Sequence, residues 1–318
     1  MTDQAPTLDT IRAAYARIKP HIHRTPVLSS RILNEKLGGE LFFKCENFQK
    51  VAAFKARGAS NAVYSLTDDM VKRGVVTHSS GNHGAALAWA AAKRGVKAHI
   101  VMPNNAPKAK KFAVDAYGGV ILFCEPTLPA REEGVNRLMR ELGLELVHPY
   151  NDYRVIAGQG TAALELLEEV PDLDIVMTPL GGGGLLSGTA IATKGINANI
   201  RVIGAEPAAA DDGYRGFKQG KLIENASSPT ICDGLRSMMG DKSFPIVRDK
   251  VDDIVLASEE NVVRAMRMTW ELMKIVVEPS ACPPLAAILE GNLDVKGKRV
   301  GIVLTGGNVD LDKLPWQQ

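Results

Sequence analysis

Short apolar runs alternate with helical stretches along most of this 318-residue chain. The apolar runs are residues 75–77, 98–102, 120–124, 145–147, 175–178, 202–205, 253–257 and 300–304. Runs that are apolar throughout, rather than at every second position, are typical of strands covered on both faces. Parallel strands also need a crossover helix between them. The pattern therefore predicts the α/β class, with two doubly wound parallel-sheet domains.

A cluster of Pro, Asn and Asp at residues 149–152 interrupts this alternation. We predict that residues 74–147 form a smaller domain, and that residues 1–73 and 148–318 together form a larger one. Helices are expected at residues 84–94, 108–117, 131–142, 158–169, 185–194, 258–273 and 283–290. Residues 207–248 show neither the helical nor the strand period, and we predict an irregular stretch there.

The composition is that of an ordinary soluble globular protein, with 45% hydrophobic and 23% charged residues. A formal net charge of +2 favours neither nucleic acid nor an anionic membrane as a partner. The chain lacks an apolar run of the roughly 18 residues that a membrane helix needs, and its N-terminus does not resemble a secretory signal. The four widely spaced cysteines indicate neither a zinc site nor a disulfide framework. We therefore expect a cytoplasmic protein.

Residues 79–84, Ser-Ser-Gly-Asn-His-Gly, connect an apolar run to a predicted helix. Backbone N–H groups at a helix start attract anions, and the helix dipole adds to this attraction. The side chains of Ser79, Ser80 and Asn82 supply further donors, which suits a carboxylate. A polar N-cap on a buried helix would explain the same residues.

A run of four glycines, Gly181, Gly182, Gly183 and Gly184, follows the apolar run 175–178. Without side chains, this backbone can approach an anion closely, and the following helix start completes a phosphate cradle. The run matches neither the dinucleotide-binding glycine pattern nor the P-loop, so a nucleotide is disfavoured. The alternative is a flexible loop.

Lys55 stands between Phe54 and Ala56. An apolar setting lowers the pKa of a lysine and makes its neutral amine a nucleophile, although most lysines are solvated surface groups. Thr305 ends the last apolar run and is followed by Gly-Gly-Asn. Its hydroxyl could bond a ring nitrogen or belong to a plain turn. An amine, a phosphate cradle and such a hydroxyl are together what a pyridoxal-phosphate enzyme needs.

Glu206 and Asp212 flank Ala210 after the apolar run 202–205. Two carboxylates and a backbone carbonyl this close together suit a hard cation such as Mg²⁺ or Ca²⁺. A solvated acidic loop is the alternative interpretation.

Taken together, the motifs resemble the fold-type II pyridoxal-phosphate enzymes, also called the tryptophan-synthase-β-like family. Within it they are most similar to the branch of serine racemases and threonine/serine dehydratases. The resemblance covers nearly the whole chain, and the motifs stand in the family's order. It implies the tryptophan-synthase-β-like fold, pyridoxal 5'-phosphate as cofactor, and Mg²⁺ (or Ca²⁺ or Mn²⁺). It also implies a small amino-acid substrate and a homodimer.

The resemblance also implies roles for individual residues. Lys55 is the Schiff-base lysine, Phe54 packs against the cofactor ring, Asn82 bonds the ring's 3-hydroxyl, and Thr305 bonds the pyridine nitrogen. The phosphate loop is Gly181, Gly182, Gly183, Gly184 and Leu185. The residues expected at the substrate are Ser79, Ser80, Asn82, His83, Arg131 and Ser237. The cation ligands are Glu206, Asp212 and the carbonyl of Ala210.

The implied reaction is the elimination of a β-hydroxyl from a 3-hydroxy amino acid, which makes the enzyme a carbon–nitrogen lyase. Lys55 removes the Cα proton, and the products are a 2-oxo acid, formed through an imine, and ammonia. Ser80 matches the opposite-face acid/base of the racemases, so racemisation is a second expectation. A β-replacement synthase and a non-catalytic small-molecule binding protein are further alternatives.

Two departures from the family concern the substrate. Residues 51–53 are Val-Ala-Ala where the family usually has Thr-Gly-Ser, and Tyr150 replaces a small polar residue. With Arg131 and His148 nearby in the family layout, the pocket could hold a second carboxylate, which an arginine fork suits. We hypothesise β-hydroxyaspartate as substrate, giving iminosuccinate and then oxaloacetate with ammonia. The alternatives are simple packing changes and a plain L-serine or L-threonine dehydratase.

Overall fold

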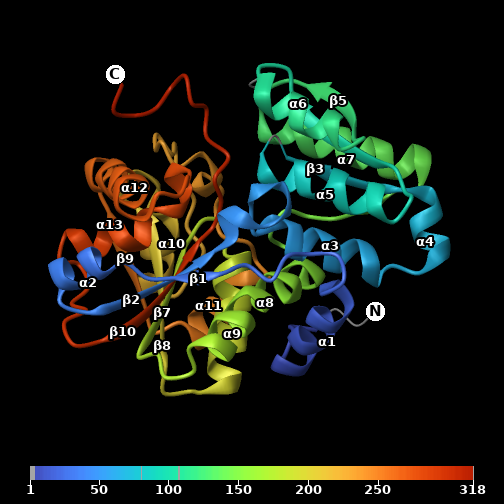
Figure 1. Cartoon of the computed structure of the whole chain (residues 1–318). Coiled ribbons are helices and arrows are strands. Elements are labelled where there is room, and N and C mark those ends of the chain that lie inside the picture. Colours follow the sequence, from blue (N-terminus) through green and yellow to red (C-terminus); the bar gives the residue numbers. More distant parts are fainter. Residues whose placement is uncertain (1–3, 80, 107, 318) are drawn as a thin grey trace.

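The computed structural model describes residues 4–79, 81–106 and 108–317, and it shows two lobes that are each built on a sheet (Figure 1). Within these ranges, the larger sheet has six strands. Their order is β1 (Val27–Leu28), β2 (Glu40–Cys45), β10 (Arg299–Leu304), β7 (Ile175–Pro179), β8 (Arg201–Pro207) and β9 (Asp253–Ala257). Neighbouring strands from β2 to β9 are parallel, whereas the two-residue edge strand β1 runs antiparallel to β2.

The smaller sheet has four parallel strands in the described ranges. Their order is β5 (Val120–Cys124), β4 (Ala98–Pro103), β3 (Val75–His78) and β6 (Glu145–Leu146). The predicted α/β class with parallel sheets in two domains is confirmed. All four strands lie within residues 74–147, while the domain boundaries themselves stay a prediction.

Both faces of the smaller sheet are covered by helices. Val75, Ile100 and Met102 pack on the side of α5 (Asn82–Lys93). The alternate residues Val76 and Val101 pack against α7 (Leu128–Leu142). This is why the strands read as continuous apolar runs in the sequence.

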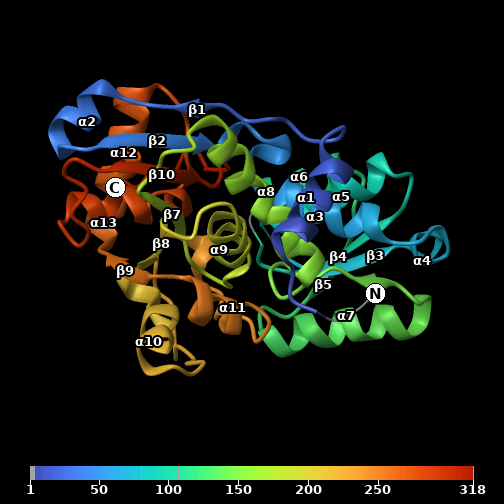
Figure 2. The ribbon, with the colours of Figure 1, turned by 90° about the horizontal axis from the view of Figure 1, so that it is seen from below.

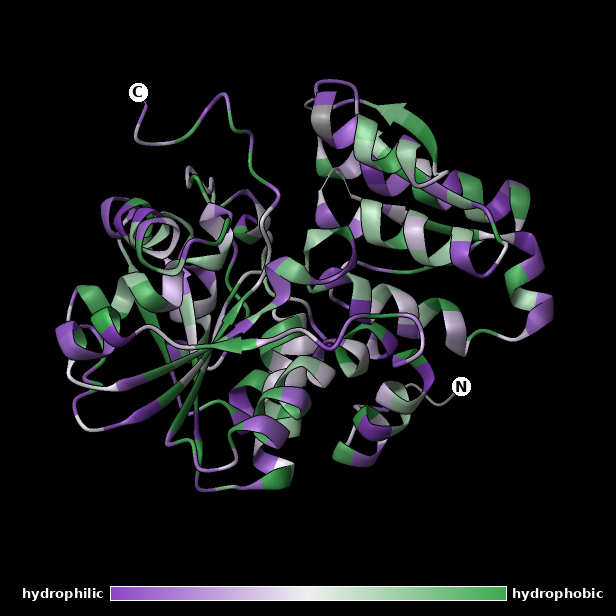
Figure 3. Ribbon diagram, in the orientation of Figure 1, coloured by the Kyte–Doolittle hydropathy of each residue, from purple (hydrophilic) through white to green (hydrophobic). Residues whose placement is uncertain are grey.

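The larger sheet is sandwiched in the same way. On one face, β-strand side chains pack with α12 (Glu259–Met273) and α13 (Pro283–Leu289). On the other face lie α8 (Tyr153–Glu169), α9 (Gly184–Ile196) and α11 (Ser243–Lys250) (Figure 2). The strands are mostly hydrophobic, and hydrophilic residues gather on the outer helices (Figure 3). None of the described helices is both long and apolar enough to cross a bilayer.

Six further α-helices complete the described ranges. They are α1 (Leu8–Ile18), α2 (Arg31–Leu37), α3 (Lys55–Ser65), α4 (Asp68–Arg73), α6 (Lys108–Ala116) and α10 (Asp212–Gln219). The prediction of an irregular stretch at 207–248 was wrong, because α10 lies inside it and α11 begins inside it. The start of α10 is held by Glu206 of β8, whose carboxylate accepts from two N–H groups of the helix. A cap supplied by a preceding strand leaves no local start signal in the sequence.

A fully buried ion network fixes α3 in the interior. Arg57 donates to both oxygens of Glu46 (2.7 and 2.8 Å) and to both oxygens of Glu165 (3.0 and 2.7 Å). Lys44 donates to Glu165 at 2.7 Å. Because the network joins β2, α3, α8 and the 3₁₀ turn Glu46–Phe48, it sets the position of α3 relative to the larger sheet.

We expect Glu165→Ala to destabilise the protein by about 3–5 kcal/mol, because it leaves two buried cations with one carboxylate. Denaturant unfolding measures the loss. The matched control is Glu168→Ala on the same helix, which removes a solvent-exposed pair with Arg24 and should cost below about 1 kcal/mol. Equal losses in the two variants would contradict a special role for the buried network.

Candidate active site

Lys55 is the first residue of α3, a helix that packs against both α5 of the smaller lobe and α8 of the larger lobe. Its Nζ donates to the carbonyl of Pro149 at 2.7 Å and lies 5.0 Å from the centre of the Phe54 ring. Burial lowers the pKa of the Lys55 amine to about 8. A sizeable share of this amine is therefore neutral near physiological pH, as a nucleophile requires.

The segment 147–150 brings three of the sequence motifs together. The carbonyl of Val147 lies 3.1 Å from His83 Nε2, and the carbonyl of Pro149 accepts from Lys55. The Tyr150 ring packs directly on the glycine run, at Gly182. Motifs that are distant in the sequence thus meet at one short connection between the lobes.

The glycine run lies between β7 and the start of α9. Gly183 has a left-handed backbone (φ 83°), and a Cβ placed there would lie 2.8 Å from Ser243 Cβ. A Cβ at Gly182 would lie 2.2 Å from Tyr150 Cγ, and one at Gly181 would lie 3.0 Å from Leu235 Cα. The run therefore admits no side chains, and the unpaired N–H groups at the helix start suit a phosphate.

Thr305 lies at the end of β10, is buried, and its Oγ1 donates to the Ser280 carbonyl at 3.4 Å. The backbone N–H of Phe54 donates to the Thr305 carbonyl at 3.0 Å, which ties this strand end to Lys55. Leu185, the other predicted cofactor residue, is buried in the first turn of α9. A nucleophilic amine, a side-chain-free helix start and a hydroxyl at an adjoining strand end together fit pyridoxal phosphate.

Asn82, the first residue of α5, is held from both ends of its amide. Its Nδ2 donates to Glu278 Oε1 at 2.9 Å, and its Oδ1 accepts from Asn308 Nδ2 at 3.0 Å. Burial, followed by the charge of Asp233, raises the pKa of the Glu278 carboxyl to about 8. We did not predict Glu278 or Asn308 as site residues. Asn308 stands in the Thr-Gly-Gly-Asn motif, so its place in the site could have been predicted. Glu278 belongs to no recognisable motif, so the sequence does not mark it as a site residue.

The stretch just before Lys55 has an unusual backbone. Val51 and Ala52 both have positive φ, at 56° and 51°, which is uncommon for residues with a Cβ. The carbonyl of Val51 accepts from Asn308 Nδ2 at 2.8 Å, and the carbonyl of Ala52 accepts from the Gly307 N–H at 3.0 Å. The loop at the end of β10 therefore holds this turn in place.

His83 is a neutral, fully buried imidazole. Burial, reinforced by the nearby charge of Lys55, lowers its pKa well below the usual value. Its Nδ1 has no hydrogen-bond partner among the described residues. Ser79 Oγ accepts from the Gly81 N–H at 3.3 Å. Ser80 lies outside the described residues, so its predicted roles in carboxylate binding and proton transfer stay predictions.

A cluster of aromatic and basic side chains surrounds Tyr150. The rings of His78 and His148 lie 5.1 Å apart, and those of His148 and Tyr150 lie 4.7 Å apart. The pKa of each histidine is lowered to about 4, mainly by burial, and at His78 the charge of Arg131 contributes to this shift. Burial raises the pKa of Tyr150, and the exposed Ser237 side chain lowers it in part. Arg131 lies in the first turn of α7, which begins three residues earlier than the predicted helix at 131–142.

The predicted cation ligands lie at the end of β8 and the start of α10, and the charge of Asp212 acts on Tyr150 of this cluster. Glu206 is buried, and its oxygens accept from the N–H groups of Gly213 (3.2 Å) and Tyr214 (2.8 Å). Burial raises the pKa of Glu206 well above its usual value, and the charge of Asp212 raises it further. Burial also raises the pKa of Asp212 to about 6. Two buried carboxylates of which one raises the pKa of the other suit a cation, and Ala210, whose carbonyl is the third predicted ligand, ends the 3₁₀ turn that follows β8.

The described ranges contain no cluster of three or more His, Cys, Asp or Glu side chains suited to a metal. The predicted site rests instead on two carboxylates and a carbonyl, a set that hard cations accept.

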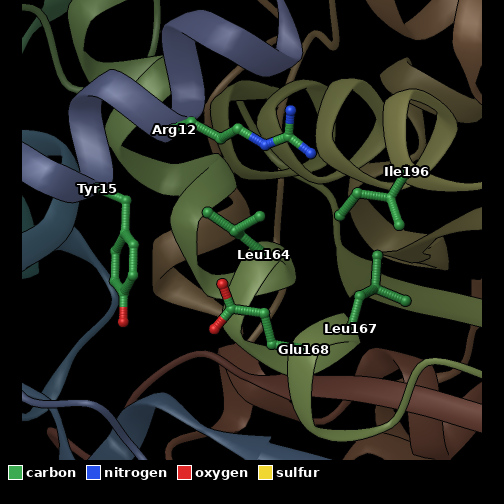
Figure 4. A pocket seen from close by; sticks show the side chains of 6 residues that line it. All are labelled: Arg12, Tyr15, Leu164, Leu167, Glu168 and Ile196. Atoms are coloured by element: carbon green, nitrogen blue, oxygen red, sulfur yellow. The ribbon is translucent and has the colours of Figure 1, made fainter.

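A hollow on the molecular surface lies elsewhere, between α1, α8 and α9 (Figure 4). Its lining is Arg12, Tyr15, Leu164, Leu167, Glu168 and Ile196. None of the predicted site residues borders this hollow. We therefore assign the catalytic chemistry to the residues around Lys55 and not to the hollow.

Comparison with known proteins agrees with this assignment. Residues 18–306 match the family described as "Pyridoxal-phosphate dependent enzyme". The chain is 51% identical over 311 residues to the "beta-hydroxyaspartate dehydratase" of Paracoccus denitrificans, covering 98% of this chain and 99% of that one. It is 48% identical to a "Serine racemase" of Oryza sativa subsp. indica, over 98% of this chain and 94% of the relative. The solved structure of maize serine racemase superimposes with a TM-score of 0.96 at 48% identity, covering 99% and 97% of the two chains.

We expect Asp212→Ala to abolish stabilisation by Mg²⁺, because the predicted cation site would lose one of its two carboxylates. At about 100 times its Kd, a bound cation stabilises the folded state by roughly 2.7 kcal/mol, which thermal unfolding with and without Mg²⁺ detects. Asp211→Ala is the matched control, because this neighbouring carboxylate pairs with Arg215 instead. Undiminished stabilisation of Asp212→Ala by Mg²⁺ would place the cation elsewhere.

Proposed function

Because the chain belongs to the pyridoxal-phosphate dependent enzymes of fold type II, we propose that it is a dehydratase acting on a 3-hydroxy amino acid. The preferred substrate in this proposal is β-hydroxyaspartate. Loss of the β-hydroxyl gives iminosuccinate, which hydrolyses to oxaloacetate and ammonia. The proposal includes Mg²⁺ at Glu206, Asp212 and the Ala210 carbonyl. A homodimer and a cytoplasmic location stay predictions.

The observation that carries the substrate choice is the charge balance around Tyr150. His78 and His148 are neutral at physiological pH, whereas Arg131 retains a positive charge that acts on both His78 and Tyr150. A substrate with a second carboxylate would find there a cationic fork and a phenol hydroxyl, which are suitable donors. Serine and threonine have no second anionic group for Arg131 to bind.

Similarity supports the same choice. The relative named beta-hydroxyaspartate dehydratase matches this chain almost end to end at 51% identity. Relatives named serine racemase are nearly as similar, at 48%, so similarity by itself does not separate the two activities. The charge of Arg131 is therefore the observation that supports β-hydroxyaspartate over serine in this proposal.

When bound, pyridoxal phosphate supplies an electron sink for the negative charge that develops at the substrate Cα. The chain's own residues bind the substrate and transfer the proton. The N–H groups of 181–185 would anchor the phosphate, and Ser79, Ser80 and His83 are the residues predicted to bind the α-carboxylate. Lys55 takes the Cα proton, for which an amine with a pKa near 8 is well matched to neutral pH. Arg131 orients the β-carboxylate, so that the β-hydroxyl leaves from a fixed geometry.

Serine racemisation is the second candidate, favoured by the similarity to serine racemases. It requires a proton donor on the face opposite Lys55, and the predicted residue for that role is Ser80. Racemisation and elimination share the removal of the Cα proton, so one enzyme can perform both.

The proposal is tested by a screen of 2-oxo acid and ammonia release over L-serine, L-threonine and the β-hydroxyaspartate isomers. We expect one hydroxyaspartate isomer to exceed L-serine at least about tenfold in kcat/KM, because only it engages Arg131. Lys55→Ala is the negative control and should remain folded but inactive. If the enantiomer of serine forms faster than 2-oxo acid from any substrate, the chain is a racemase and the proposal is wrong.

We expect Arg131→Ala to lower kcat/KM for hydroxyaspartate by about 10- to 100-fold, because a charge-assisted hydrogen bond to the second carboxylate is lost. The effect on L-serine should stay within about threefold. Arg137→Ala, at an exposed position of the same helix, is the control for general effects on α7. Equal losses on both substrates would remove Arg131 from substrate selection.

A further inference from the structure

The amide of Asn82 is oriented by two partners from the larger lobe. Nδ2 donates one N–H to Glu278 Oε1 at 2.9 Å, and Oδ1 accepts from Asn308 Nδ2 at 3.0 Å. An amide has two N–H groups and two carbonyl lone pairs. One N–H and one lone pair of Asn82 therefore remain for a ligand.

The two partners exclude the opposite orientation of the amide. After a flip, the Asn82 NH₂ group would face the NH₂ group of Asn308, whose orientation the Val51 carbonyl holds, and its carbonyl oxygen would replace the N–H donor at Glu278 Oε1. The hydrogen bond with Asn308 and the N–H donation to Glu278 would both be lost. The position of the remaining N–H is thus set by Glu278 and Asn308 and not by Asn82 itself.

The network extends to the turn that precedes Lys55. Asn308 Nδ2 also donates to the Val51 carbonyl at 2.8 Å, and the Asn308 backbone N–H donates to Glu278 Oε2 at 3.2 Å. Glu278 is 5% exposed. One buried carboxyl therefore accepts from both lobes, through Asn82 of α5 and through the loop that follows β10.

We propose that Glu278 and Asn308 are positioning residues that act through Asn82, holding its free N–H toward the ring oxygen of the bound cofactor. This inference rests on the proposed function, because it takes pyridoxal phosphate as the ligand. A glutamate is required at position 278, since both of its neighbours donate. Glutamine offers one acceptor oxygen and one NH₂ group, so it must lose one of the two contacts.

The test is a double-mutant cycle on the dissociation constant of pyridoxal phosphate, with the absorption spectrum of the bound cofactor as second readout. The variants are Glu278→Gln, Asn82→Ala and the double variant. We expect Glu278→Gln to raise the dissociation constant about tenfold and to change the spectrum. In the Asn82→Ala background the same change should have less than about a twofold effect, because the residue through which Glu278 acts is gone.

Two further variants complete the experiment, one as a control and one as an independent test. Glu290→Gln is the matched control, because Glu290 also accepts from a backbone N–H (Ser258, 2.9 Å) and an asparagine amide (Asn261, 2.8 Å). It should leave cofactor binding unchanged. Asn308→Ala changes an exposed side chain, so it tests the same coupling through Asn82 Oδ1 even if Glu278→Gln does not fold.

Equal effects of Glu278→Gln with and without Asn82, or unchanged binding and spectrum in both Glu278→Gln and Asn308→Ala, would overturn the inference while leaving the proposed function intact. A wild-type protein that neither binds pyridoxal phosphate nor shows a visible cofactor band would overturn the proposed function, and this inference with it.

Discussion

The buried guanidinium of Arg57 is the constraint on which the geometry of the site depends. It lies two residues after Lys55 and is bound by the carboxylates of Glu46 and Glu165, the second of which also binds Lys44. Buried charges of this kind persist only when every partner is in place. Because the partners come from β2, a 3₁₀ turn and α8, the start of α3 can take one position and one rotation. The direction of Lys55 follows from that placement, as does its contact with the segment 147–150.

Burial then sets the chemistry around Lys55 by pushing ionisable groups toward their neutral forms. It lowers the pKa of Lys55 to about 8 and of His148 to about 4, and it raises the pKa of Glu278 to about 8. Few fixed charges therefore remain beside the amine, so backbone N–H groups and helix starts are the main groups there that suit an anion. In such a setting one cation has a large effect, and the proposal of a dicarboxylic substrate therefore rests on the charge of Arg131.

The turn before Lys55 has a backbone that glycine would adopt more readily than the residues present. Val51 and Ala52 retain left-handed conformations that cost of order 1–3 kcal/mol each for residues with a Cβ. Hydrogen bonds from Gly307 and Asn308 hold the turn against this strain. The departure from the family's Thr-Gly-Ser therefore removes hydroxyls near the amine, and the surrounding loop compensates for the missing glycine.

The sequence by itself determined the alternating strands, the α/β class, the junction of Gly181–Gly184 with a helix and the order of the motifs. These features follow from local periodicity and from residues whose chemistry shows in short segments. Only the tertiary structure decided that Glu278 orients Asn82, that α10 begins on a carboxylate of the preceding strand, and that Arg57 anchors α3. Such contacts join residues far apart along the chain. Their energies arise from burial and mutual orientation, which exist only once the two sheets have been packed together.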